Sequence, residues 1–339
     1  MTHLARIRGG WPLAALVTLV LVVTGLASLG GASQDQIVLT ALINLLFVVA
    51  LYVFVGLSGV LSFGHMSFGA IGAYTAAILV IPADVKLSLF FGMPNVLVHA
   101  HASPLVSVLA GGVVAALFAL VVGIPLLRLT GLAASLATFA LLLIVNSVAT
   151  NWSSVTGGAS GVSAVPTTTS ITQVMVVVLV AMVVAFAFQE SSWGLRLRAS
   201  REDEVAARGA GISVVTARTI GWVISAFFTG VAGALYGEFL GSFNASAFYL
   251  SITFVILAML VVGGLTSLAG AVVGSILLSV VSEVLRRAEG GFHVASLHVP
   301  GRPGLSELGL ALIMILILVL RPRGITGGRE ISLPRARKK

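Results

Sequence analysis

The sequence contains no cysteine and very little charge. Without cysteine, no disulfide, thiolate ligand or iron–sulfur site can form. Charged residues make up only 9% of the 339 positions, whereas soluble domains carry roughly 25%. Hydrophobic residues reach 58%, and the mean hydropathy is +1.12. A charge deficit of this size over the full length predicts an all-α integral membrane protein rather than a soluble protein with an anchor.

Lysine is also scarce. The only three are Lys86, Lys338 and Lys339, and none follows the glycine loop that a phosphate-binding P-loop requires. The H-E-x-x-H and Cys/His metal spacings are missing as well. We therefore expect no catalytic residue, no metal and no cofactor on this chain. The net charge of +8 does not indicate a nucleic-acid partner, because the basic residues lie at the ends of apolar runs and in the tails.

About ten segments are long and apolar enough to cross a bilayer within a single domain covering residues 1–339. They are Trp11–Leu29, Ile37–Val55, Gly56–Ile81, Pro104–Leu127, Leu132–Ala149, Ile171–Phe188, Thr219–Gly237, Leu250–Val262, Ala269–Leu285 and Leu305–Leu320. The first lacks a convincing signal-peptide cleavage site, so we interpret it as a retained span. An even number of spans puts both termini, including the basic tail 321–339, in the cytoplasm of a cell-membrane protein. Arg286 and Arg287 then fall on the outer side, against the positive-inside rule.

The segment 190–218 concentrates the charge of the chain. Nine of the thirty charged residues lie in it: Glu190, Arg196, Arg198, Arg201, Glu202, Asp203, Glu204, Arg208 and Arg218. Such a segment cannot lie in hydrocarbon, and its arginines predict a cytoplasmic loop. Good helix formers predict one short helix over 201–208, ended by glycine, with Ser213 capping the next helix. Small and apolar residues within the loop favour docking of a partner protein over simple solvation: Val205, Ala206, Ala207 and Ile212.

The stretch 56–74, GLSGVLSFGHMSFGAIGAY, is too rich in glycine and polar residues for a plain lipid-facing helix. Glycines in such a stretch allow close helix packing or interrupt a helix along a transport pathway. His65 lies at membrane depth or at its edge, where a polar residue is either functional or bonded to a nearby backbone carbonyl. Asn44 and Asn146 lie inside spans, where interhelical hydrogen bonds are their commoner role.

Several stretches resemble one known family. Residues 56–74 are similar to its G-x-x-G-x-x-S-x-G-H-x-x-F-x-x-I-G-A-Y pattern, and Thr156–Val162 to its external T-G-G loop. The stretch 194–237 looks like its coupling loop and following span, and Pro322–Ile325 like its C-terminal ending. The chain thus resembles a permease subunit of the branched-chain amino-acid (Liv-type) ABC importers, nearer to the M-type. It has Ala159 and Ser160 where the family commonly carries an acidic or amide residue.

The resemblance implies an ABC importer permease with Gly-interrupted helices. It would pair with a second homologous permease, two ABC ATPase subunits that hold the ATP and Mg, and an extracytoplasmic substrate-binding protein. The coupling loop would act through Arg201, Glu202, Glu204, Ala206, Ala207, Gly211 and Ile212. The permeation pathway or helix break would involve Asn44, Gly59, Ser62, Gly64, His65 and Gly69. The external loop would use Thr156, Gly157 and Gly158.

Other functions are compatible with the sequence. Close relatives in the same class import urea, short amides or other amino acids, and no residue pattern separates these cargoes. An ion-coupled secondary transporter would need ionisable residues deep in its spans, but Glu238, Glu283 and Glu307 lie near span ends. A channel or a structural membrane subunit is the third alternative. A docking helix in the charged loop favours the ABC permease.

Overall fold

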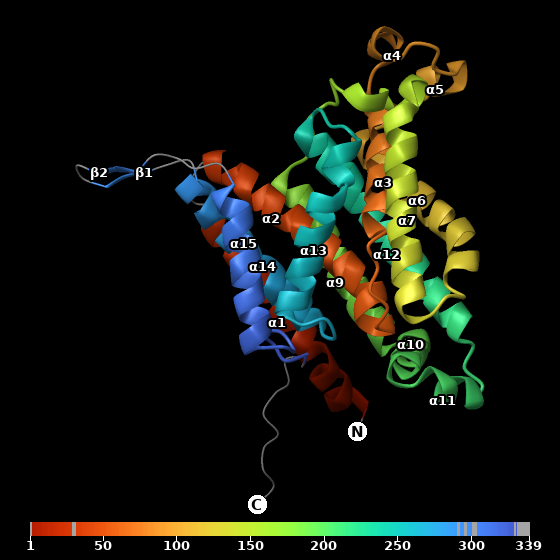
Figure 1. Ribbon diagram of the computed structural model, residues 1–339, viewed down its shortest axis with the longest axis vertical. Coiled ribbons are helices and arrows are strands. Elements are labelled where there is room, and N and C mark those ends of the chain that lie inside the picture. The colour runs from red at the N-terminus through yellow and green to blue at the C-terminus, as the bar shows by residue number, and fades with distance from the viewer. Residues whose placement is uncertain are drawn as a thin grey trace, which may run out of the picture. The chain divides into compact units, whose positions relative to one another are not determined.

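A computed structural model describes residues 2–28, 32–289, 292–294, 297–299, 304–328 and 330 (Figure 1). Its long helices are α1 (Thr2–Ser28), α2 (Ala32–Leu51), α3 (His65–Val80), α6 (Pro104–Leu126), α7 (Gly131–Asn151), α9 (Ile171–Glu190), α12 (Val214–Leu240), α13 (Leu250–Gly263), α14 (Leu268–Glu289) and α15 (Leu305–Leu320). Shorter elements are a π-helix η1 (Tyr52–Gly56), α4 (Ala83–Leu89), α5 (Asn95–His99), α8 (Ser153–Thr156), η2 (Gly158–Ser160), α10 (Ser192–Glu202), α11 (Glu204–Gly209) and η3 (Ala245–Phe248). Strands β1 (Phe292–Val294) and β2 (Leu297–Val299) form one antiparallel hairpin.

The predicted membrane fold is confirmed. Within the described ranges, eight helices are long and apolar enough to cross a membrane. A ninth candidate is the pair α3 and α4, which is bent by 120°, and α15 contributes a shorter apolar stretch over Leu308–Ile317. Each predicted segment is therefore helical over most of its length, but Gly56–Ile81 is interrupted at residues 59–64. Ten is an approximate count. Part of the predicted first span, Leu29, and much of the basic tail, Arg329 and 331–339, lie outside the described residues.

The chain divides into two compact units. Unit 1 comprises residues 1–48 and 256–339, and unit 2 comprises residues 49–255. Both boundaries fall inside helices, in α2 and in α13.

Unit 2 is built around three helices, α3, α6 and α12, whose backbones approach closely. A Cβ atom added to Gly72 or Gly233 would collide with the backbone of Gly230 or Gly69 on the facing helix, and one on Gly111 would lie 2.7 Å from the carbonyl oxygen of Gly72. These glycines are needed because no larger side chain fits between the helices. Small residues let membrane helices gain dispersion contacts where lipid supplies no hydrophobic drive.

The stretch between α2 and α3 is a broken helix. The final turn of α2 widens into the π-helix η1, and residues 59–64 are not helical before α3 begins at His65. Gly59 turns the chain with a φ of +73°, a conformation that glycine adopts without strain. The glycine-rich stretch therefore contains a helix break at 59–64 and closely packed glycines after it. π-bulges of this kind are common at functional sites.

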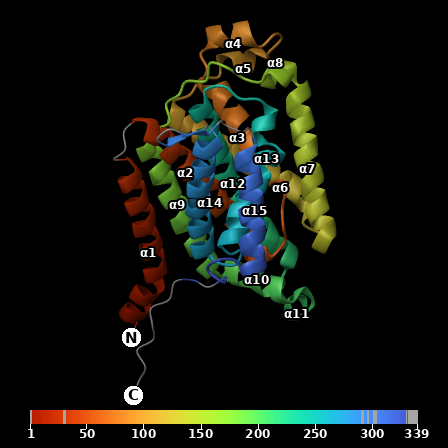
Figure 2. The same ribbon diagram turned by 60° about the vertical axis from the view of Figure 1, so that its left-hand side comes forward.

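In unit 1 the C-terminal segment packs on the turn between α13 and α14. The backbone N–H groups of Ile325 and Thr326 donate to the carbonyl oxygens of Val262 and Gly263 at 2.9 and 3.1 Å. The Glu330 carboxylate accepts from the Leu268 N–H at 2.7 Å at the start of α14, where a negative charge is favoured. The beginning of α1 and the end of α15 lie on the same side of this unit (Figures 1 and 2).

Candidate functional site

The charged segment after α9 forms two short helices rather than one. Ser191 caps α10 by accepting from the Gly194 N–H at 3.2 Å. The Asp203 carboxylate accepts from the N–H groups of Val205 and Ala206, both at 2.9 Å, and so begins α11. The single helix predicted over 201–208 was wrong, because Asp203 is a better N-cap than a helix-interior residue. The α11 helix ends at Gly209, and Gly211 takes a φ of +79°, as the glycine pattern predicted.

Ion pairs fix α11 against the start of α12. The Glu204 carboxylate accepts from Arg208 at 2.5 Å and from Arg218 at 2.9 Å. The Arg218 side chain is only 5% exposed, so this charge depends on its partner. Ser213 occupies the predicted N-cap position of α12, but its hydroxyl lies 2.7 Å from the Thr216 hydroxyl rather than on a backbone N–H.

Within unit 2, the outer face of α11 is exposed and could contact a partner protein. Val205 is 81% exposed, and the predicted coupling residues Glu202, Ala206 and Gly211 are exposed beside it. Ile212 is half-buried. Ala207, by contrast, is buried, so a bulky substitution there would disturb the packing of α11 rather than its outer surface.

Arg201 connects this segment to the helix break. Its guanidinium donates a 2.9 Å hydrogen bond to the carbonyl oxygen of Gly56, the last residue of η1. Its aliphatic chain lies over Gly59, where a Cβ atom would collide with it. The second contact of the guanidinium is the Glu202 carboxylate at 2.6 Å. Arg201 was predicted as a coupling residue, but its partner 145 positions earlier was not.

Two further hydrogen bonds hold the π-helix. The Tyr52 hydroxyl donates to the side-chain carbonyl of Gln189 at 2.7 Å, and the Ser225 hydroxyl donates to the carbonyl oxygen of Ala50 at 2.6 Å. Arg198 donates to the backbone carbonyl of the same Gln189 at 2.6 Å. The sequence prediction missed these residues. A glutamine at the end of an apolar span indicates a buried hydrogen bond, but the sequence does not show which residue is its partner.

His65 lies just beyond the break and is enclosed by protein. It is 1% exposed, with the rings of Phe54, Phe68 and Trp222 at centroid distances of 5.6, 5.8 and 4.8 Å. Its Nδ1 atom lies 2.7 Å from the Ser62 hydroxyl, so the partner is a side chain rather than the backbone carbonyl expected. The tight aromatic packing makes His65 an anchor for the start of α3 in this conformation.

The other predicted pathway residues are mostly at packing contacts. Ser62 is buried against His65. Gly64 lies against α7, where an added Cβ would be 2.5 Å from the carbonyl oxygen of Thr138. Gly69 packs on Gly233, whereas Gly59 is exposed. Asn44 is half-buried on the part of α2 that belongs to unit 1. Asn146 makes the interhelical type of bond expected, to the carbonyl oxygen of Ala245 at 3.1 Å.

The predicted external loop is a compact turn. The Thr156 hydroxyl lies 2.6 Å from the carbonyl oxygen of Ala149 and 2.7 Å from that of Trp152, and Gly157 and Gly158 both take positive φ. Val162 then forms a β-bridge with Phe243. Together these segments line a polar cavity of about 450 Å³, bordered by Ser160, Ser163, Ser242, Asn244 and Ser246. Hydroxyls and an amide make this an uncharged surface that can hydrogen-bond to a polar ligand.

Glu238 lies near this loop as a buried acid. Its carboxylate oxygens are 3.1 Å from the hydroxyls of Ser107 on α6 and Thr168 in the loop. Since Glu238 belongs to α12, it links three segments of unit 2. These contacts indicate a structural role, in which Glu238 holds the loop against α6 and α12.

Comparisons with known proteins agree with the motifs. A family model described as "Branched-chain amino acid transport system / permease component" matches residues 33–320. The LivM permease proteins of the high-affinity branched-chain amino acid transport systems of Salmonella typhimurium and Escherichia coli K12 are each 27% identical over 318 residues, covering 84% of this chain and 68% of the relative. A probable LivH permease of Methanocaldococcus jannaschii is 30% identical over 138 residues, covering 41% of this chain and 42% of the relative. Because the family model spans most of the sequence, the chain belongs to the family of permease components of branched-chain amino acid transport systems.

Proposed function

We propose that the chain is the permease subunit of an ATP-driven ABC importer for branched-chain amino acids. In this proposal a second homologous permease completes the pathway, two ABC ATPase subunits hold ATP and Mg, and an extracytoplasmic binding protein delivers the substrate. Family membership supports the class, and the branched-chain amino acid transport systems to which the LivM relatives belong support the cargo. The observation that carries the mechanism is the bond from Arg201 in the charged segment to the helix break at Gly56.

The charged segment is proposed to face the cytoplasm. The helices α10 and α11 lie at one end of unit 2, and α8 lies at the other (Figure 2). The arginines of the 190–218 segment belong on the cytoplasmic side by the positive-inside rule. The turn at 156–162 and its polar cavity then face outward, where the binding protein would release its substrate.

The arrangement suggests how ATP binding and hydrolysis would be used. The ATPase would grip the outer face of α11 around Val205, and its closure would displace α10 and α11. Arg201 would transmit that displacement to Gly56, while His65 holds the start of α3. The intervening residues 59–64 would act as the hinge, because they are not helical. Rigid helices moving about a short break are a common form of transport switch.

Substrate selection is proposed to rest mainly with the binding protein. The outer cavity offers hydroxyls and an amide but no charged side chain among its lining residues, so it would bind a zwitterion weakly. Equilibrium binding of radiolabelled leucine to the permease–ATPase complex without binding protein tests this. Tight, saturable binding would contradict it.

The class is tested by the composition of the native assembly. The tagged chain would be extracted gently from its own membrane, and co-purifying proteins would be identified by mass spectrometry. Recovery of a second permease and two P-loop ATPases is the expected result. Recovery of the chain alone, with uptake into liposomes driven by an ion gradient, would overturn the ABC assignment in favour of a secondary transporter.

A further inference from the structure

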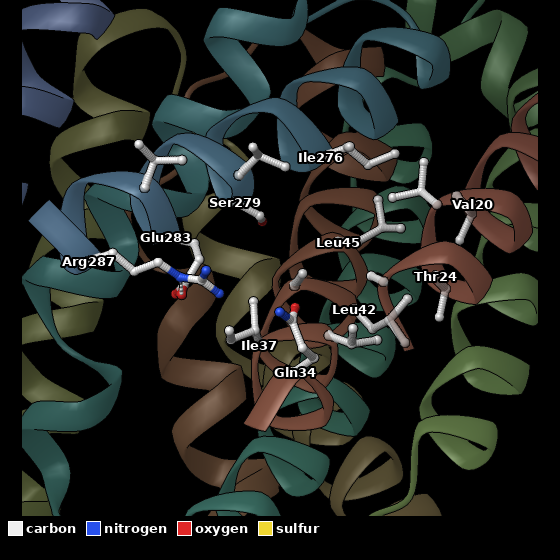
Figure 3. Close-up of a pocket in the computed structure, with 16 residues that line it drawn as sticks. Val20, Thr24, Gln34, Ile37, Leu42, Leu45, Ile276, Ser279, Glu283 and Arg287 are labelled. Carbon is white, nitrogen blue, oxygen red and sulfur yellow. Dashed lines mark hydrogen bonds and ion pairs between the residues drawn. The ribbon is translucent and has the colours of Figure 1, made fainter. Parts of the chain in front are cut away.

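A groove lies between α1, α2 and α14 in unit 1 (Figure 3). It encloses about 250 Å³ and is lined mainly by aliphatic side chains. Those side chains include Val20, Val38, Leu42, Leu45, Ile276 and Val280, and the uncharged polar residues in the lining are Thr24, Gln34 and Ser279. Nothing in the transport account above uses this groove.

One end of the groove is charged. Figure 3 shows Glu283 and Arg287 together at that end, and Ile276 and Val20 at the other. The Glu283 carboxylate accepts from Arg286 at 2.7 Å and from Arg287 at 2.6 Å. Both arginine side chains remain more than half exposed, at 66% for Arg286 and 59% for Arg287. They retain donors for a further acceptor, since a guanidinium carries five N–H groups.

The length of the groove indicates the size of its occupant. It follows α14 from Ile276 to Arg287 and α2 from Gln34 to Leu45, and eleven residues of helix rise about 16 Å. The hydrocarbon core of a bilayer is about 30 Å thick, so one leaflet is about 15 Å deep. The length of the groove along the helices thus matches the thickness of one leaflet. A leucine molecule would occupy only part of that length.

The charge at the end with Glu283 and Arg287 indicates the head group. Arg287 lines this end, and Arg286 lies beside the groove, paired with the same Glu283 carboxylate. Both attract a phosphate, since arginine binds phosphate oxygens well. Three acids belong to the same helix ends: Asp35 in the first turn of α2, Glu283, and Glu289, which accepts from the Gly304 N–H at 2.7 Å. With two arginines and three acids, this end does not favour a purely anionic head group. A head group with both a phosphate and an ammonium satisfies both signs.

We propose that this groove is a binding site for a zwitterionic phospholipid, whose acyl chain lies between α1, α2 and α14 and whose phosphate is held by Arg286 and Arg287. The site explains the two arginines that oppose the positive-inside rule, because their charge is met by Glu283 and by the lipid phosphate. It does not depend on the transport direction or on the cargo.

Photolabelling of the intact permease complex tests the site. Vesicles would contain phosphatidylethanolamine with a diazirine on one acyl chain, and adducts would be mapped by mass spectrometry. Adducts should concentrate on peptides covering 20–27, 34–45 and 276–287. Val280→Trp should fill the groove and reduce these adducts at least about fivefold, because a tryptophan cannot share so small a space with an acyl chain. Val176→Trp, at an exposed position of α9, is the matched control and should leave the groove adducts unchanged.

The head group is tested separately. Arg286→Gln with Arg287→Gln should lower the same adducts, whereas Arg323→Gln at the other end of unit 1 should not. Adducts spread evenly over all exposed apolar helices would overturn the proposal. Competition by leucine would show an amino-acid site instead, and crosslinks from the groove to the second permease would show a protein interface instead. Stronger labelling by phosphatidylglycerol would overturn the zwitterionic assignment.

Discussion

The guanidinium of Arg201 and the carbonyl oxygen of Gly56 are joined by a 2.9 Å hydrogen bond. Arg201 lies near the end of α10, and Gly56 ends the π-helix that precedes the break before α3. The last carbonyl groups of a helix have no partner within the helix, and Gly56 lies just before the non-helical residues 59–64, so a charged donor can satisfy its carbonyl. The bond therefore joins the proposed surface for the ATPase to the proposed hinge in a single contact.

Val205 tests the docking surface. Val205→Asp should lower the amount of ATPase recovered per permease about tenfold, because it places a carboxylate at the centre of an apolar contact. The fold of the chain should be unaffected, since the side chain is 81% exposed. Quantitative mass spectrometry of the tagged complex measures the ratio. Thr130→Asp is the control, because it adds the same charge at the exposed N-cap of α7. Equal recovery from both variants would show that α11 is only solvated.

Gly64 tests the close approach of the break to α7. In Gly64→Ala the new methyl group would lie 2.5 Å from the carbonyl oxygen of Thr138, and overpacking of this kind costs about 1–3 kcal/mol. Thermal unfolding of the solubilised complex should show a lower midpoint, and uptake should fall. Gly25→Ala in α1 has open space around it and should be neutral or slightly stabilising. A Gly64→Ala protein as stable and active as the wild type would refute the packing role.

Glu238 tests the clamp on the external loop. Glu238→Ala leaves the Thr168 and Ser107 hydroxyls without this acceptor, which costs about 1–3 kcal/mol for a buried group. Hydrogen exchange of residues 163–169 should become faster. Glu238→Gln keeps a side-chain carbonyl in place and should restore most of the protection. Equal exchange in all three proteins would mean that these hydrogen bonds do not hold the loop.

Lys86 tests the small helices between α3 and α6. Its buried ammonium donates to the carbonyl oxygens of Leu97 and Ala100 at 3.1 and 2.5 Å, at the end of α5. Lys86→Met keeps the bulk of the side chain but removes these donors, so residues 95–100 should become sensitive to limited proteolysis. Leu87→Met changes an exposed neighbour and should leave the proteolysis pattern as in the wild type. Resistance of both variants would show that the ammonium is not needed there.

Much of the fold could be predicted from the sequence because a bilayer restricts it. Apolar runs of about 20 residues can only be helices in lipid, so the predicted spans are helical apart from the break at 59–64 within Gly56–Ile81. Boundaries were harder, because helices continue past the hydrocarbon: α1 begins at Thr2, well before Trp11. The split at Asp203 was missed because helix propensity was favoured over a capping side chain.

The site was predictable in location but not in its contacts. Charge identified the 190–218 segment, and glycine density identified the stretch that contains the break at 59–64. Neither pattern shows that Arg201 reaches Gly56 or that Ser225 reaches Ala50, since such pairs depend on how distant helices pack. Ala207 illustrates the same limit. Its small side chain led to the prediction that it belongs to the docking surface, but the packing of α11 buries it.

The most direct test of the account is the number of leucine molecules transported per ATP hydrolysed by the complete complex in proteoliposomes. Arg201→Met removes the bond to Gly56, and a charged hydrogen bond is worth about 1.5–3 kcal/mol. We expect the ratio to fall at least about tenfold while ATP hydrolysis and assembly persist. Arg128→Met removes an exposed arginine at the turn between α6 and α7 and should not change it. An unchanged ratio in a normally assembled Arg201→Met complex would contradict the claim that this contact carries the coupling.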